Sequence, residues 1–124
     1  MIQKKHRGRF GERLACDYLK RRQWVIVATN VHYREGEIDI VALDGPTHVF
    51  VEVKLRTSRW NGVPEEAVDH AKQSRLASAI DRYCADHEIT GPIRVDLMMI
   101  EIRAVQGRAV LRHHRGVIFD APDD

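Results

Sequence analysis

The sequence lacks several features that would assign it to particular protein classes. No stretch approaches the roughly 18 consecutive apolar residues of a membrane span, and the basic, polar N-terminus has no apolar signal core. The two cysteines, Cys16 and Cys84, form no CxxC or Cys/His spacing typical of zinc or redox sites. Internal repeats, low-complexity tracts and linkers are also absent. We therefore expect one cytoplasmic domain over residues 1–124, with reduced cysteines and no membrane partner.

Basic residues are unevenly distributed, although the formal net charge is only +2. The segment Met1–Arg22 holds eight lysines and arginines against only Glu12 and Asp17. A second segment, Arg103–Arg115, holds four arginines and no acidic residue. Such clusters favour a polyanion partner, because lysine and arginine release counterions from phosphate backbones. The alternative interpretation is ordinary solvated surface charge.

Apolar spacing and turn residues predict two helices and five strands in the order α, β, β, β, α, β, β. A helix start is indicated at Gly62 and Pro64, where proline suits the first turn and the two glutamates that follow favour the positive end of the helix dipole. The predicted helices are Phe10–Arg22 and Pro64–Asp86, and the predicted strands are Trp24–Val27, Glu37–Leu43, His48–Leu55, Ile93–Ile102 and Ala109–His113. These elements predict an α/β fold.

The hairpin made by the second and third strands has a register that side-chain type can test. If Asp44 pairs with Thr47 across the turn, Asp39 lies directly opposite Glu52, and Lys54 lies two residues further along the same face. Three charged groups then share one patch of the sheet. The opposite face becomes an unbroken aliphatic surface made of Ile38, Ile40, Ala42, Val49, Val51 and Val53.

This patch has the composition of a metal-dependent hydrolytic site. Opposed carboxylates at Asp39 and Glu52 destabilise a sheet unless a cation compensates them. Mg²⁺ prefers oxygen ligands and often takes only one or two protein carboxylates, and Mn²⁺ shares the preference for oxygen. Lys54 would orient the attacking water or stabilise charge that develops during phosphodiester hydrolysis. The alternative is that Glu-x-Lys is an exposed salt-bridging pair.

Two charged positions on the predicted helices are candidates for the same site. Glu12 and Lys72 lie on or beside the apolar stripes of their helices, where a charged side chain needs a partner. Glu12 would reach the metal or its waters, and Lys72 or the neighbouring Gln73 would contact the scissile phosphate. The alternative is a side chain that extends from the edge of the stripe into solvent.

Arginine and aromatic residues near the patch are candidates for gripping nucleic acid. Arginine positions phosphates, and an exposed indole can stack on an unpaired base, although Trp60 would serve equally well as a hydrophobic plug over the end of the sheet. The predicted nucleic-acid contacts are Arg7, Arg9, Arg34, Arg56, Arg59, Trp60 and Gln73.

Several motifs that include these residues occur together along almost the whole chain. They are Gly8-x-x-Gly11-Glu12, Gly36-Glu37-Ile38-Asp39, Val49-Phe50-Val51-Glu52-Val53-Lys54-x-Arg56, Gly62-x-Pro64 and Val95-Asp96. In this combination the sequence resembles the YraN family of bacterial proteins, which are predicted endonucleases related in fold to Holliday-junction resolvases.

The resemblance implies a PD-(D/E)-x-K nuclease with a restriction-endonuclease-like αβββαβ core, in which helices flank a central mixed sheet. Glu12, Asp39, Glu52 and Lys54 fall on the catalytic pattern of that superfamily. The same pattern implies that Val53 offers its backbone carbonyl to the metal. His32 stands where the family usually has arginine, which weakens the inference about substrate grip but leaves the metal ligands unaffected.

The sequence therefore predicts a Mg²⁺- or Mn²⁺-dependent endonuclease that hydrolyses phosphodiester bonds of DNA, with branched or junction DNA among its candidate substrates. The main alternative is a nucleic-acid-binding module of a repair or recombination assembly that does not cleave. A third interpretation is a structural salt-bridge cluster, which two carboxylates and one lysine satisfy poorly. A homodimer would favour a two-fold junction as substrate, but no residue decides the oligomeric state.

Overall fold

Five strands form one sheet, and two helices pack against it in the computed structural model, which describes residues 4–57, 70–103 and 107–117. The sheet order follows the chain order, β1 to β5, and only β3 and β4 are parallel. The elements are α1 (Lys4–Arg21), β1 (Val25–His32), β2 (Glu37–Asp44), β3 (Thr47–Thr57), α2 (His70–Asp86), β4 (Ile93–Arg103) and β5 (Arg108–His114). The predicted α/β fold is confirmed: α1 to β4 form the αβββαβ core, and β5 extends the mixed sheet.

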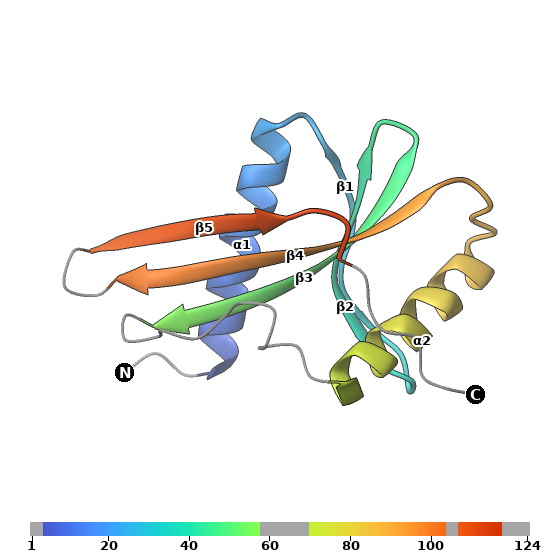
Figure 1. Cartoon of the computed structure of the whole chain (residues 1–124), viewed down its shortest axis with the longest axis horizontal. Coiled ribbons are helices and arrows are strands. Elements are labelled where there is room, and N and C mark those ends of the chain that lie inside the picture. The colour runs from blue at the N-terminus through green and yellow to red at the C-terminus, as the bar shows by residue number, and fades with distance from the viewer. Residues whose placement is uncertain (1–3, 58–69, 104–106, 118–124) are drawn as a thin grey trace.

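The helices cover opposite faces of the sheet because alternate residues of each strand point to opposite sides. On one face, Ala15 and Leu19 of α1 pack against a buried cluster that includes Val51 and Met98. On the other face, Leu76, Ala79, Ile80 and Tyr83 of α2 pack against Val41 and Phe50. Figure 1 shows α1 passing behind strands β3, β4 and β5, while α2 lies beside β2. The parallel pair β3–β4 needs a crossover, and α2 lies in that connection.

The predicted register of the β2–β3 hairpin is confirmed from Asp44–Thr47 to Ile40–Val51. The turn depends on Gly45, whose φ of 59° lies in the left-handed region that glycine adopts without strain. Beyond Ile40 the prediction is wrong, because Ile38 packs in the α2 cluster and does not continue the aliphatic face of Ile40.

Asn30 of β1 explains why Ile38 changes face. The pairs Thr29–Ile40 and Val31–Ile38 flank Asn30, which has a φ of 53°. A residue in this left-handed conformation breaks the strict alternation of a strand, and asparagine tolerates it better than most residues. The kink sends Val31 and Ile38 together to the α2 side.

The remaining element boundaries agree closely with those predicted from the sequence, with three exceptions. Helix α1 was expected to begin at Phe10, but it begins six residues earlier, at Lys4. Strand β1 was expected to end at Val27, but it continues to His32 across a register shift between Ile26 and Ala28. The bulge and the kink at Asn30 hide the period-2 pattern by which a strand is recognised. The predicted start of the second helix near Gly62 and Pro64 lies outside the described residues. Within the described parts of the chain, neither helix is both long and apolar enough to cross a bilayer.

Candidate active site

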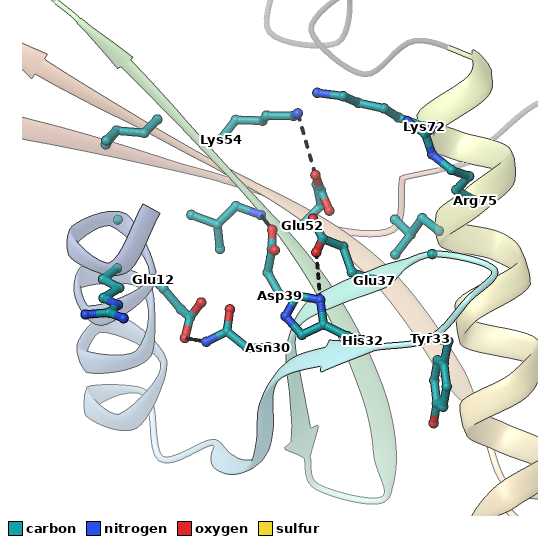
Figure 2. A pocket seen from close by; sticks show the side chains of 16 residues that line it. Glu12, Asn30, His32, Tyr33, Glu37, Asp39, Glu52, Lys54, Lys72 and Arg75 are labelled. Atoms are coloured by element: carbon teal, nitrogen blue, oxygen red, sulfur yellow. Dashed lines mark hydrogen bonds and ion pairs between the residues drawn. The ribbon is translucent and has the colours of Figure 1, made fainter. Parts of the chain in front are cut away.

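A cleft of about 900 Å³ opens where β2 and β3 stop pairing, between the N-terminal half of α1 and the N-terminal half of α2. Five elements contribute to its wall. Figure 2 shows Glu12 and Asn30 approaching from the α1 and β1 side, Lys72 and Arg75 from α2, and the β3 residues Glu52 and Lys54 between them. The residues predicted from the hairpin register therefore converge in one cavity.

Asp39 is held by the backbone of the neighbouring strand. Its Oδ2 accepts a hydrogen bond of 2.8 Å from the Val53 N–H. The carboxylate therefore occupies the position where a β2 carbonyl would otherwise continue the ladder. In a strand, the N–H and C=O of one residue project to the same side. The Val53 carbonyl therefore faces the Asp39 side of β3 and not β4.

Glu52 is a partly buried carboxyl group whose burial outweighs the attraction of the nearby lysines. Burial, and then repulsion from Asp39, raise the pKa of Glu52 to about 7, although Lys54 and Lys72 act in the opposite direction. The pKa of Asp39 is also raised, chiefly by burial, despite the hydrogen bond from Val53. Neighbouring carboxylates that both resist ionisation favour the approach of a cation.

Lys54 is the nearest cation to this pair. Its Nζ lies 3.6 Å from the Glu52 Oε1, and only 15% of its side chain is exposed. Burial lowers the pKa of Lys54, and a contact with Lys72 lowers it further. In Figure 2 the two lysine side chains point toward one another above the Glu52 carboxylate. Two ammonium groups beside one carboxylate form a cationic edge to the cleft, which suits a phosphate oxygen.

Glu12 enters the cleft from α1 and is oriented by Asn30. Its Oε1 accepts a hydrogen bond of 2.7 Å from the Asn30 side-chain amide. Burial and the charge of Asp39 raise the pKa of Glu12, while the Asn30 hydrogen bond lowers it. The kink in β1 that redirects Ile38 therefore also places the amide that orients Glu12.

The turn between β1 and β2 is pressed against α2 and fixes the width of the cleft. A Cβ atom added at Gly36 would collide with the backbone carbonyl of Arg75, so this position requires glycine. Arg82 of α2 binds the same turn, with its Nη1 3.0 Å from the Glu35 Oε2 and its guanidinium over the Tyr33 ring. The turn and α2 therefore form one wall.

The predicted nucleic-acid contacts are only partly brought together. Arg9 is exposed and lines the cleft. Three others do not contribute to the cleft wall. Arg34 is exposed on the β1–β2 turn, and Arg56 of β3 and Gln73 of α2 are half-buried. The side chains of Arg7, Arg59 and Trp60 lie outside the described residues.

Five residues with polar side chains in the cleft wall were not candidates from the sequence. Glu37 belonged to a motif but had no assigned role, and Asn30 had no assigned role either. His32 was noted only as a departure from the family. His32 Nδ1 lies 3.0 Å from the Glu37 Oε2 at the exposed rim. Tyr33 and Arg75 carried no signal at all, because only the close approach of the turn to α2 brings them to the cleft.

The donor set fits a hard divalent cation. The described residues contain no group of three or more His, Cys, Asp or Glu side chains that could hold a metal ion by themselves. Asp39 and Glu52 supply two carboxylates, and the Val53 carbonyl faces the same side. Mg²⁺ commonly takes one or two carboxylates and completes its shell with water and substrate phosphate, and Mn²⁺ shares its preference for oxygen. Nitrogen and sulfur ligands of the zinc type are not gathered here.

Comparison with known proteins assigns the chain to a family. A profile described as "Uncharacterised protein family UPF0102" matches residues 11–100. A "UPF0102 protein" of Arthrobacter sp. (strain FB24) is 45% identical over 111 residues, which cover 89% of this chain and 93% of the relative. Another, from Dehalococcoides mccartyi, is 36% identical over 109 residues, covering 87% and 90%. The chain therefore belongs to the UPF0102 family, which is the YraN family that its motifs resemble.

Proposed function

We propose that this member of UPF0102 is a metal-dependent endonuclease that hydrolyses phosphodiester bonds of DNA. One observation carries the proposal: the partly buried carboxyl groups of Asp39 and Glu52 meet beside Lys54 in an open cleft, and both have a raised pKa. In a purely structural cluster of charged side chains, the protein would supply enough hydrogen-bond donors and cations to keep the carboxylates ionised. Perturbed carboxyl groups in a cleft are instead typical of functional sites.

Asp39, Glu52 and the Val53 carbonyl would hold the ion, with Glu12 contacting it or its waters. A divalent ion bound there supplies Lewis-acid polarisation of the scissile phosphate. Glu52 must lose its proton to act as a ligand, so its pKa of about 7 couples ion binding to pH. Water attacks phosphorus, the bond to the leaving oxygen breaks, and that oxygen takes up a proton.

Lys54 has the position of a group that stabilises the transition state. Its ammonium lies on the cleft side of Glu52, where negative charge grows on the phosphate oxygens during attack. A preorganised cation in a partly water-excluded site stabilises that developing charge more strongly than the same cation would in water. Lys72 approaches the same point from α2 and would bind the phosphate before reaction.

Cleavage of labelled duplex, single-stranded, flap and four-way-junction DNA with Mg²⁺ or Mn²⁺ tests the proposal. We expect the wild type to cleave at least one of these substrates, and Lys54→Ala to lose on the order of 100-fold or more of that activity while retaining DNA affinity. Arg112→Ala, which removes an exposed cation from β5, is the matched control and should cleave normally.

Unchanged cleavage by Lys54→Ala would remove the role given to Lys54. If the wild type cleaves none of the substrates but binds them in a salt-sensitive manner, the alternative of a non-catalytic nucleic-acid-binding module replaces the nuclease.

A further inference from the structure

One flank of α1 carries a row of exposed cations that begins at the cleft. Arg9, Arg13 and Lys20 are all exposed, and their spacing of four and seven residues places them on the same side of an α-helix. Glu12 and Cys16 lie next to this row on the side nearer the sheet. Because Glu12 reaches Asn30 of β1, the row lies on the β1 side of α1.

The other flank of α1 has a different character. Leu14 and Tyr18 pack into the core on that side, and Tyr18 makes an edge contact with the His113 ring of β5. Asp17, the second acidic residue of α1, borders the row, four residues after Arg13 and three before Lys20, but it forms no ion pair with either among the described residues. Arg22 lies on this flank, over the Tyr18 ring, whereas the exposed cations that continue along α1 from the cleft lie toward β1.

The cations of the row are not used inside the protein. Among the residues that the structure describes, no carboxylate lies within ion-pair distance of Arg9, Arg13 or Lys20. Internal ion pairs involve other arginines, notably Arg82 and Arg94. A row of uncompensated exposed cations gains most from a partner with regularly spaced negative charges.

Strand β1 adds a second kind of donor beside the row. It is an edge strand, so some of its backbone N–H groups point away from β2. Its eight residues, Val25–His32, include no acidic side chain. Backbone N–H groups are common phosphate donors in nucleic-acid complexes, and no carboxylate on this edge would repel a phosphate.

We infer that a duplex arm of the nucleic-acid substrate leaves the cleft along the β1 side of α1, where Arg13 and Lys20 contact its phosphate backbone. The inference rests on the proposed function, because it takes the substrate in the cleft to be DNA. From Arg9 to Lys20 the helix rises about 16 Å. At about 3.4 Å per nucleotide along one strand, this corresponds to about five nucleotides on one side of the cut.

Salt-dependent binding of a fluorescent DNA duplex of about 20 base pairs, measured in EDTA, tests the inference without requiring cleavage. The double variant Arg13→Ala/Lys20→Ala removes two proposed phosphate contacts. We expect its slope of log K against log salt to be shallower by about 2, and its affinity in 0.1 M salt to fall roughly 10- to 100-fold. Alanine favours helix, so α1 should remain stable, which thermal unfolding will verify.

The comparison variant Arg108→Ala/Arg112→Ala removes two exposed cations of the second basic segment, on β5 at the opposite edge of the sheet, and so decides which of the two basic segments binds the duplex. It should leave the slope of the wild type nearly unchanged. Equal losses in both double variants would mean that only net charge matters, and an unchanged slope in Arg13→Ala/Lys20→Ala would mean that the arm lies elsewhere; either result overturns the inference. Because binding is measured without divalent ions, absence of nuclease activity would not by itself affect this result.

Discussion

Carboxylates at two places on the same sheet behave in opposite ways. Asp96 of β4 is fully buried and receives hydrogen bonds from Arg94, His113 and the Gly116 N–H, at 2.7–3.1 Å. Burial by itself raises the pKa of Asp96, but these hydrogen bonds outweigh it and hold the pKa at about 2. Asp39 and Glu52, in contrast, have raised pKa values, chiefly because of burial and, at Glu52, also because of repulsion from Asp39.

The difference separates a structural carboxylate from a ligand-binding one. Asp96 connects β4 to β5, while Arg94 also reaches Asp44 in the β2–β3 turn, so the ionised group holds three parts of the fold together. Asp39 and Glu52 face a cleft, where Lys54 and Lys72 together do not offset the cost of burying the two carboxylates. A buried carboxylate stabilises the fold when the protein itself supplies its hydrogen-bond donors. A carboxylate without enough such donors is instead compensated by a cation that binds from solution.

The largest expected effect comes from removing the structural carboxylate. Asp96→Ala leaves Arg94 and His113 without their buried partner, and such broken pairs cost about 3–5 kcal/mol of unfolding free energy. Chemical denaturation measures this loss. Asp39→Ala should lose far less unfolding free energy. Equal losses for Asp96→Ala and Asp39→Ala would mean that Asp39 is a structural carboxylate like Asp96.

A smaller effect of opposite sign is expected at Glu52 when no divalent ion is present. A carboxyl group whose folded pKa is raised favours folding at low pH, and this contribution is lost as pH rises from about 4.5 to about 7. Glu52→Gln stays neutral, so its unfolding free energy at pH 8 should exceed that of the wild type by about 2 kcal/mol, while the two proteins differ little near pH 4.

Glu88→Gln is the matched control for this measurement, because Glu88 is exposed on the turn after α2. It should leave the stability at both pH values nearly unchanged. If Glu52→Gln is less stable than the wild type at pH 8, the Glu52 carboxylate stabilises the fold, as the Asp96 carboxylate does.

The hairpin register explains why the sequence predicted much of the site. Turn chemistry at Asp44–Thr47 and side-chain alternation are local properties, and they sufficed to place Asp39, Glu52 and Lys54 on neighbouring strands. The same local reasoning predicted most strands and both helices. It also predicted that Asp39 would lie directly opposite Glu52, whereas Asp39 instead accepts the Val53 N–H.

The features that the sequence did not predict depend on contacts between distant segments. The left-handed conformation of Asn30 switches the faces of β1 and β2, and no alternation rule anticipates it. Gly36 is required because α2 passes against the β1–β2 turn, a contact that also brings Tyr33 and Arg75 to the cleft. Asp96 appeared only within a motif, and its low pKa arises from His113 on β5, Arg94 on its own strand and the Gly116 N–H beyond β5.

The most direct test of the account is the thermal stability of wild type and Glu52→Gln at pH 8, with and without Mg²⁺ or Mn²⁺. Binding to the folded state raises the Tm, so the account predicts that either ion raises the Tm of the wild type and of Glu88→Gln but not that of Glu52→Gln. Lowering the pH below about 7 should weaken the rise, because protons compete for Glu52. No rise in the wild type, or an equal rise in Glu52→Gln, would contradict the assignment of Asp39 and Glu52 as a cation site.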